Sequence, residues 1–493
     1  GMGISATTWP RNFVTPRILP CLLCLGLTVA LLPAASLPDP YGATFDGSVS
    51  MWKRSDSTHV LREQSNWLLA AGVDGVLGQI PVNAVLAAMR DCQVTSGSNQ
   101  GQWWWKQEDG KVTDANAAFF TALPLIVFRQ RFPDRLDATG LGVLDAMLAD
   151  AEVFFRKAIN TTDWKYPNAR LGELVCAYLI GVQRGSDLTL PRSKLVAGLT
   201  YWRDQQWGWG EHLSDIYAKV CQDELSVLLL LAPSLPADIR SLALGLLREL
   251  EAIDQRYAGG LRVPTIRSYA YTSSYRTPTY IPSHARTYRE LLVPLSTTSN
   301  RAEPEALRAI CATQGWHDLV GTVTAAADGI PCFNGHQAWA RFAGSLRVGV
   351  LSHFPIMAGI DFRTWGLSHQ SFPAAFWRTS GDWGFLQWET VENGQKLAGQ
   401  NKASDPMYLS TQKDPGPIPT TQSLRLPHGY AILRSMPSVL STWTSLEDRV
   451  RVIEGTAERT TEQFGDWHRL VLTWPEAGPG HQLVIDHLPL QAG

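Results

Sequence analysis

The sequence carries little charge, and neither sign is in excess. Only 18% of its 493 residues are charged. The 43 lysines and arginines and the 45 aspartates and glutamates give a formal net charge of −2. Proteins that bind nucleic acid usually carry a basic patch or run, and none stands out along this chain. We therefore expect no nucleic-acid partner.

Cysteine is scarce, and its spacing argues against two common frameworks. The chain has 7 cysteines. Cys21 and Cys24 lie in an N-terminal apolar run, and the others are Cys92, Cys176, Cys221, Cys311 and Cys332. The five cysteines outside that run are odd in number and cannot all pair with one another, and their spacing lacks the CxxC pairs of structural zinc sites. We expect no disulfide framework and no metal centre. Cys176 and Cys221 fall in apolar helical patterns, which predicts core positions.

Several catalytic signatures are also absent. The chain has no GxGxxG after a strand, no P-loop, no GxSxG and no HExxH, so dinucleotide-binding, nucleotide-hydrolysing, serine-hydrolase and zinc-protease chemistry lack their motifs. We accordingly expect no cofactor. A calcium site built from carbonyl oxygens leaves no comparable signature, and the sequence leaves that question open.

An apolar run near the N-terminus follows two basic residues. Arg11 and Arg17 precede the segment 18–35, which ends in small residues. This order is typical of a secretory signal, which we place at residues 1–36, followed by a linker at 37–56. The alternative is an N-terminal anchor, since a membrane span needs roughly 18 apolar residues. Both readings predict an exported protein, secreted, periplasmic or at the cell surface, and after signal removal we expect no membrane span.

Helical periodicity dominates the chain after the linker. Apolar residues recur with a period near 3.6 in segments separated by Pro, Gly and polar clusters, for example at 115–132, 141–159, 169–183, 215–231 and 237–253. About ten such helices without strands between them predict antiparallel pairs stacked around a common centre. We therefore expect an (α/α) toroid at residues 57–315.

Beyond residue 316 the pattern changes to short strands. Alternating or aromatic-rich runs occur at 339–354, 383–391, 429–436, 439–446, 449–456 and 468–475. The segment 396–422 is rich in Pro, Ser, Thr, Asp and Lys, which predicts a loop. Helices followed by strands indicate an α+β multidomain protein, with the toroid followed by an antiparallel β-sandwich at residues 316–493.

Tryptophan is unusually frequent, since the chain contains 19 of these residues. Large aromatic side chains either fill a core or form flat surfaces on which sugar rings pack, so a carbohydrate is a candidate ligand. The candidates for such surfaces are Trp103, Trp104, Trp105, Trp164, Trp207 and Trp209. Core packing is the alternative for each of them.

Two helix starts carry polar side chains suited to chemistry. Asn168 follows Pro167, a residue that favours the first helical turn, and a neutral amide there is a good donor to a carboxylate or an enolate. Downstream, Ser214 is a suitable N-cap for a helix beginning at Asp215, with Tyr217 at its third position. His212 then lies just before the helix, and only this placement lets the imidazole and Tyr217 point into one cleft.

The order of these features resembles that of polysaccharide lyases of the hyaluronate and chondroitin AC type, a plan shared broadly by heparinase II/III-like and alginate lyases. The matching features are the helical first domain, Asn168 at a helix start, the GEH…Y segment 210–217 before an apolar helix, the Arg-bearing segment 262–290 and the β domain. The similarity covers about residues 57–493. It implies an enzyme that cleaves a uronate-containing, anionic polysaccharide by β-elimination.

The resemblance also implies a role for each matching residue. β-Elimination needs a group that neutralises the uronate carboxylate, a base for the C5 proton and an acid for the leaving oxygen. Asn168 corresponds to the neutralising group. Tyr217 corresponds to the base, the acid or both, and His212 to a partner in the base role.

Arginine side chains complete the implied site. Arg267 or Arg286 would bind uronate carboxylates in a forked geometry, with Arg262 and Arg276 as alternatives. His336, at the start of the β domain, is a candidate neighbour of the cleft.

Two other functions fit parts of the same pattern. A glycoside hydrolase on an (α/α) toroid needs two carboxylates flanking the scissile bond. The candidates are Asp109, Asp114, Glu211, Asp215, Asp223 and Glu224, among which no pair stands out. A non-catalytic carbohydrate-binding protein needs only the tryptophan surface. The sequence leaves the oligomeric state open.

Overall fold

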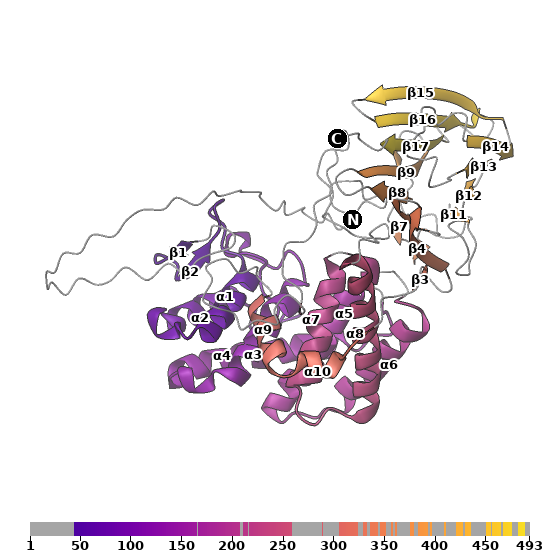
Figure 1. The fold of residues 1–493 in the computed structure, drawn as a ribbon. Coiled ribbons are helices and arrows are strands. Elements are labelled where there is room, and N and C mark those ends of the chain that lie inside the picture. The colour runs from indigo at the N-terminus through magenta and orange to yellow at the C-terminus, as the bar shows by residue number, and fades with distance from the viewer. Residues whose placement is uncertain are drawn as a thin grey trace, which may run out of the picture. The chain divides into compact units, whose positions relative to one another are not determined.

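The computed structural model describes residues 44–164, 166–207, 211–214, 216–258, 288 and 305–323, and beyond them a series of strands with residues 456–457 and 474–475. The chain divides into two compact units. The first comprises Gly1–Met147 with Ser296–Ala306, and the second Leu148–Leu295 with Leu307–Gly493. In Figure 1 the first strands and helices run from indigo to magenta, the helices after residue 305 are orange, and the later strands run from orange to yellow.

The first unit begins with a small hairpin and continues as helices. Its elements are β1 (Thr44–Asp46), β2 (Met51–Lys53), α1 (Leu61–Asp74), α2 (Val82–Asp91), α3 (Ala117–Arg131), the start of α4 (Ala138–Ala158), and the 3-10 turns η1 (Leu77–Gln79), η2 (Gln107–Asp109) and η3 (Pro133–Arg135). β1 pairs antiparallel with β2 inside the stretch expected to be a linker. The hairpin is tied to α1, because Gln64 exchanges two 2.8 Å hydrogen bonds with the backbone of Trp52.

Helix α1 packs against α3 in the core of this unit. Leu68 on α1 and Ile126 and Phe128 on α3 are fully buried. Since α3 is apolar almost throughout, its burial is the main source of stability for the pair. α1 ends where Gly75 adopts a left-handed conformation with φ 71°, which glycine allows without steric cost.

The helices of the second unit pack in a regular pattern. They are the rest of α4, then α5 (Pro167–Arg184), α6 (Thr189–Asp204), η4 (Glu211–Leu213), α7 (Tyr217–Leu231), α8 (Ala237–Ala258), α9 (Glu305–Thr313) and α10 (Trp316–Val320). Neighbours pack as α5 on α6 and α7 on α8, and every second helix packs as α5 on α7 and α6 on α8. Helices α3, α4, α5, α7 and α8 confirm the five segments whose periodicity predicted them.

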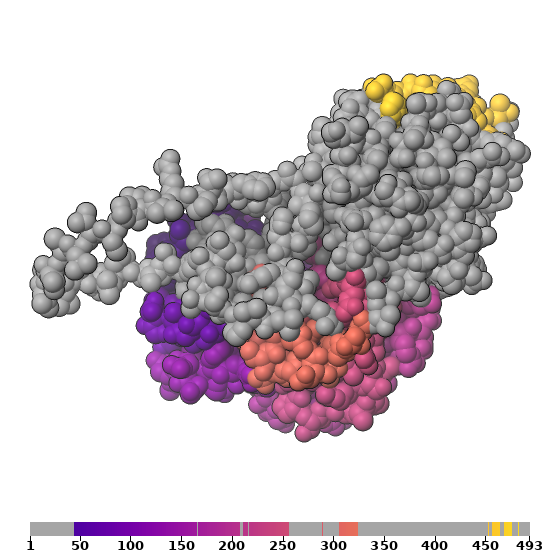
Figure 2. Space-filling view, in the orientation of Figure 1, coloured from indigo at the N-terminus to yellow at the C-terminus, as the bar shows by residue number. Residues whose placement is uncertain are grey.

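The helical part extends past residue 315, where the sequence predicted the β domain to begin. Trp316 starts α10 after Gly315, whose φ is 92°. Its indole is fully buried, donates a 2.9 Å hydrogen bond to Ser226 Oγ on α7 and stacks on Tyr288 at 4.6 Å. Trp316, predicted as the first residue of the β domain, is therefore part of the helical core. In Figure 2, α9 and α10 form the orange part of the surface.

A buried polar network joins α7 to α9. The Asp223 carboxylate accepts hydrogen bonds from Arg308 Nε at 2.8 Å and Nη2 at 3.1 Å, and from the Tyr288 hydroxyl at 2.9 Å. Arg308 and Tyr288 are 3% and 2% exposed. Burial raises the pKa of the Tyr288 hydroxyl well above its usual value, and the nearby Asp223 charge adds to this. Two donors thus compensate one buried carboxylate.

The strands beyond residue 329 form antiparallel sheets. The largest has the order β15-β16-β17-β9-β8-β5-β4-β3, with β10 beside β9, and a second has the order β11-β12-β13-β14. Their bounds are Gly329–Cys332 (β3), His336–Ala343 (β4), Leu346–Leu351 (β5), Ala375–Arg378 (β8), Trp383–Glu392 (β9), Gln395–Lys396 (β10), Leu409–Ser410 (β11), Thr421–Leu426 (β12), Gly429–Arg434 (β13), Val450–Glu454 (β14), Glu458–Phe464 (β15), Trp467–Thr473 (β16) and Gln482–Leu488 (β17). β6 (Ile356–Met357) pairs with β7 (Ile360–Asp361).

These strands confirm most of the predicted β segments and correct one loop. The segment 396–422, predicted as a loop, contains β11, which pairs with β12. β17 pairs with β9 although about ninety residues separate them, a long-range contact that local alternation does not reveal. The predicted strand at 439–446 lies outside the described residues. The protein is therefore of the α+β class, with helices followed by antiparallel strands.

The described helices include none that is both long enough and apolar enough to cross a bilayer. The apolar run 18–35, predicted as a signal, lies outside the described residues.

Replacing Arg308 tests the buried network. We expect Arg308→Met to lower the free energy of unfolding by about 3–5 kcal/mol, because it leaves the Asp223 carboxylate buried without its charged partner. Urea denaturation measures this loss. The double variant Arg308→Met/Asp223→Leu removes both charges, so most of the stability should return. An equal loss in both variants would show that packing, and not the unpaired charge, explains the effect.

Candidate functional site

Asn168 lies in the first turn of α5, as its position after Pro167 predicted. Pro167 is the first residue of the helix, and Tyr166 before it adopts a left-handed conformation with φ 59°. The proline ring excludes the preceding residue from the right-handed helical region, so the helix cannot begin earlier. Asn168 is only 3% exposed, and its side chain is held inside the helical part of the second unit.

The amide of Asn168 binds a carboxylate of the same chain. Asn168 Nδ2 donates to both oxygens of Glu211, at 2.7 and 2.8 Å, and the backbone N–H of Asn168 donates to Glu211 Oε2 at 2.8 Å. Glu211 is fully buried in η4. The positive end of the α5 dipole also favours a negative charge here. The sequence predicted Asn168 as a carboxylate donor, and the acceptor in the structure is Glu211.

Backbone strain borders both sides of this contact. Of the six non-glycine residues with positive φ in the described chain, Tyr166 precedes α5, and Gln206 (φ 49°) and Trp207 (φ 62°) end the turn after α6. A left-handed conformation costs a bulky residue about 1–3 kcal/mol and persists only where the surroundings enforce it. Such residues are frequent at functional sites, and here they hold the two segments that meet at Asn168 and Glu211.

An aromatic column supports His212 next to Glu211. The imidazole stacks on Trp207 at 5.9 Å and 11°, Trp207 stacks on Trp202 at 6.4 Å, and Trp202 meets Trp164 edge to face at 6.2 Å. Trp202 Nε1 donates to the Trp164 carbonyl oxygen at 3.1 Å. His212 is 1% exposed, so its ring orientation is fixed by packing.

Ser214 caps the helix that carries Tyr217. Its Oγ accepts from the backbone N–H of Tyr217 at 3.0 Å and of Ile216 at 3.4 Å. α7 begins at Tyr217 itself, two residues later than predicted, so Tyr217 occupies its first position and not its third. Asp215 lies outside the described residues. Tyr217 remains partly exposed, unlike Asn168 and His212.

Further acidic side chains lie deeper between α5 and α7. Glu173 on α5 and Glu224 on α7 are 6% and 1% exposed. Burial raises the pKa of Glu173. Burial also raises the pKa of Glu224 well above its usual value, and the negative charges of Asp223, Glu211 and Glu173 raise it further. Glu173 forms a 2.8 Å ion pair with Arg170, which lies one turn earlier on α5.

The sequence missed the importance of these glutamates. Glu211 and Glu224 entered only as hydrolase candidates, and Glu173 did not enter at all. A signal existed, since acidic residues inside apolar helical runs are rarely buried without a partner or a role. The partners could not be read from the sequence, because Asn168 and Glu211 are 43 residues apart.

Three of the six tryptophans predicted to form a sugar-binding surface belong to the core. Trp103 and Trp207 are fully buried and Trp164 is 8% exposed, so none offers a ring face to a sugar. Trp104 and Trp105 are partly exposed, and the Arg62 guanidinium covers the Trp105 ring at 5.2 Å. Core packing, the alternative stated for each tryptophan, describes the buried three.

Other predicted positions fall elsewhere. Trp209, Arg267 and Arg286 lie outside the described residues, as does the side chain of His336, whose backbone begins β4. Among the hydrolase candidates, Asp109 accepts from the backbone N–H of Lys106, and Asp114 from that of Asn116. Asp223 forms an ion pair with Arg308. The structure brings Asn168, His212 and the start of α7 together and adds Glu211.

The four described thiols Cys92, Cys176, Cys221 and Cys311 are buried and free of disulfides. Cys176 and Cys221 are completely buried, which confirms their prediction as core residues. Burial raises the pKa of both well above the usual thiol value. In the part of the chain that the structure describes, no three His, Cys, Asp or Glu side chains are placed to hold a metal ion.

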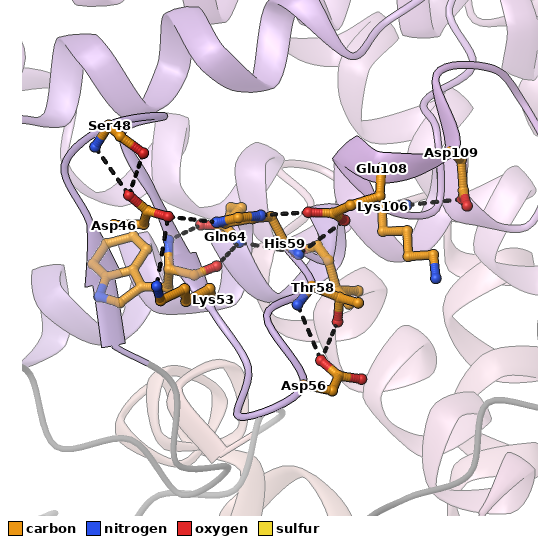
Figure 3. Close-up of polar contacts among 12 residues, drawn as sticks. Asp46, Ser48, Lys53, Asp56, Thr58, His59, Gln64, Lys106, Glu108 and Asp109 are labelled. Carbon is orange, nitrogen blue, oxygen red and sulfur yellow. Dashed lines mark hydrogen bonds and ion pairs between the residues drawn. The ribbon is translucent and has the colours of Figure 1, made fainter.

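The first unit contains a separate polar cluster centred on His59 (Figure 3). His59 Nδ1 lies 2.5 Å from Glu108 Oε1, and Nε2 lies 3.3 Å from Asp46 Oδ2. The imidazole therefore joins the β1–β2 hairpin to η2. Burial opposes ionisation of Glu108, but the hydrogen bonds from the His59 side chain and backbone outweigh it and lower the Glu108 pKa.

Replacing the hydrogen-bond donor of the Asn168 side chain by an acceptor tests its contact with Glu211. Asn168→Asp keeps the shape but sets two buried carboxylates, its own and that of Glu211, against each other, so we expect at least about 3 kcal/mol of lost unfolding free energy at neutral pH. Acidic pH should restore part of it, because one carboxyl is then protonated. Chemical denaturation at several pH values measures both effects. Asn160→Asp, at an exposed position, is the control with little expected change, and an equally small effect at Asn168 would contradict the contact.

The His59 cluster predicts a pH dependence of stability. Because the folded-state pKa of Glu108 is lowered, its contribution is complete above the ordinary value of 4.5 and disappears as pH falls through the lowered value. In His59→Gln we expect the Glu108 midpoint to rise toward 4.5, measured by carbon chemical shifts during a pH titration. Asp137, whose pKa is lowered by Gly140 N–H and by Asn83, should not move. An unchanged Glu108 midpoint would rule out His59 as the cause.

Comparison of the chain with protein-family models and with curated proteins gave no match in either case.

Proposed function

We propose that this protein is a polysaccharide lyase that cleaves a uronate-containing chain by β-elimination. The observation that carries the proposal is the binding of a carboxylate by the amide and backbone N–H of Asn168, next to His212 and the start of α7. Elimination beside a uronate requires such donors, because charge accumulates on the carboxylate when the C5 proton leaves.

In this proposal the substrate carboxylate competes with Glu211 for Asn168. Both side chains are buried, so a uronate can reach the Asn168 donors only if Glu211 moves aside. The donors themselves require no rearrangement, since the helix start fixes the backbone N–H and the amide. Their geometry is already the one a carboxylate needs, which is the preorganisation expected of an electrostatic site.

We assign proton transfer to Tyr217. Of the three predicted groups it alone keeps substantial exposure, and it occupies the first position of α7. The phenolate oxygen of Tyr217 takes the C5 proton, the C4–O bond breaks as the C4–C5 double bond forms, and the resulting Tyr217 hydroxyl returns the proton to the leaving oxygen. His212, buried against Trp207, is a positioning residue in this scheme.

We also propose that the helices form an (α/α) toroid and the strands a β-sandwich. Contacts of α5 with α7 and of α6 with α8, alternating with the hairpin contacts α5–α6 and α7–α8, are the pattern of two concentric helix layers. In the first unit α1 contacts both α2 and α3 in the same way. The two larger antiparallel sheets are the components that a sandwich requires.

A glycoside hydrolase is the second candidate, favoured by one observation. Glu224 is a carboxyl group whose pKa is raised by burial, as a general acid requires, and Glu211 is a nearby carboxylate. Glu224 is 1% exposed, however, and so lies further from any substrate than Tyr217. A purely carbohydrate-binding function loses three of the six predicted tryptophans, because Trp103, Trp164 and Trp207 are buried.

Incubation with alginate, hyaluronan, chondroitin, heparin and pectin tests the proposal. We expect one of them to yield the ultraviolet absorbance of an unsaturated uronate, and Tyr217→Phe to lower the rate by about 10²–10⁴-fold, because the proton-transfer group is lost. Tyr201→Phe, at a partly exposed position on α6, is the matched control and should retain the rate.

Other outcomes would assign a different function. New reducing ends without the absorbance would indicate hydrolysis, and binding without either product would indicate a binding protein. A rate unaffected by Tyr217→Phe would remove Tyr217 from the mechanism.

A further inference from the structure

Glu224 is a buried carboxyl group without a local partner. It lies on α7, is 1% exposed, and neither of its oxygens has a hydrogen-bond partner within the described residues. This distinguishes it from Glu211, which accepts three hydrogen bonds from the backbone N–H and the amide of Asn168, and from Asp223, which has Arg308 and Tyr288. A buried polar group left unsatisfied costs about 1–3 kcal/mol, so packing alone does not explain a glutamate here.

Glu224 shares a helix face with Tyr217. Positions 217, 221 and 224 follow the i, i+4, i+7 spacing of one face, so Glu224 lies two turns further along α7, about 10 Å from Tyr217 along the axis. Cys221 between them is fully buried. The stripe therefore runs from the partly exposed start of α7 into the core.

Among the described residues, the ionisable groups whose charges raise the pKa of Glu224 are all carboxyl groups. Glu173 and Cys176 face it from α5, Glu211 from η4, and Asp223 and Cys221 lie on α7 itself. Three cations of the packed elements pair with other acids, and Arg240 on α8 donates to the Leu229 carbonyl oxygen. Arg308 on α9 binds Asp223, Arg170 on α5 binds Glu173, and Lys219 on α7 binds Asp254 on α8.

We propose that Glu224 is held un-ionised and that its proton sets the charge specificity of the Asn168 site. This rests on the proposed function, in which a uronate carboxylate replaces Glu211 at Asn168. An ionised Glu224 would place a second negative charge beside that position, in a region where water screens little. A protonated Glu224 leaves the site able to accept an anion.

Two pH dependences follow, and they are measured separately. The pKa of Glu224 is raised in the folded protein, so the folded state binds more protons than the unfolded state above the ordinary value of 4.5. Stability should consequently fall as pH rises from there toward the raised value. Binding of an anionic ligand should be complete while Glu224 is protonated and should weaken as pH rises through the same raised value.

Glu224→Gln tests the first dependence without reference to function. Glutamine has the same shape and cannot ionise, so we expect a higher unfolding free energy than the wild type at mildly alkaline pH and a flatter pH profile. Glu152→Gln, at a buried position on α4, is the matched control. Its carboxylate is paired with Arg184, so stability should fall. If Glu224→Gln leaves the pH profile unchanged, Glu224 is not held un-ionised and the proposal fails.

A measurement on the wild type covers the case in which the variant does not fold. The infrared absorption of an un-ionised carboxyl group should persist at neutral pH, where exposed glutamates are ionised. Absence of this band would overturn the proposal.

Binding of a uronate oligosaccharide to Tyr217→Phe, with and without Glu224→Gln, tests the second dependence. We expect affinity to fall about tenfold at alkaline pH with Glu224 present and to stay constant with glutamine. Binding that is equally pH-independent in both proteins would overturn the charge-specificity claim and leave the lyase proposal standing. Absence of uronate binding at every pH, together with the expected stability profile, would overturn the lyase proposal and the specificity claim with it.

Discussion

The second unit depends on how three carboxylates buried at or next to α7 are compensated. Each would be costly without a partner, and each has a different environment. Glu211 is bound by the Asn168 amide at the start of α5, and Asp223 by Arg308 and Tyr288. Glu224 lacks a hydrogen-bond partner within the described chain. The first two contacts connect α7 to its neighbours, and the third leaves a carboxyl group whose charge state responds to pH.

The two compensated contacts act on different parts of α7. The pair of Asn168 and Glu211 fixes the turn before the helix, where the strained residues Gln206 and Trp207 and the stacked His212 lie. The pair of Asp223 and Arg308 fixes its middle against α9. Tyr217 therefore lies at the start of a helix that is anchored at two points, and the proton-transfer role that we propose for it requires such rigidity.

Local sequence signals predicted the elements well. Helical periodicity identified five helices, Pro167 located the start of α5, and Ser214 was recognised as a cap, because each depends on residues within a few positions. The signals failed where distant segments meet. Asp223 finds Tyr288 65 residues away and Arg308 85 residues away, and no local pattern encodes either pairing. Trp207 and Trp103 illustrate the same limit, since abundance of tryptophan does not distinguish a buried ring from an exposed one.

The central claim is that Asn168 binds the substrate carboxylate in place of Glu211. A crystal structure of Tyr217→Phe with a bound uronate oligosaccharide tests it most directly. We expect the uronate carboxylate to accept hydrogen bonds from Asn168 Nδ2 and the backbone N–H, with Glu211 rotated away. A structure in which Glu211 still occupies Asn168 while the uronate binds elsewhere would contradict the claim.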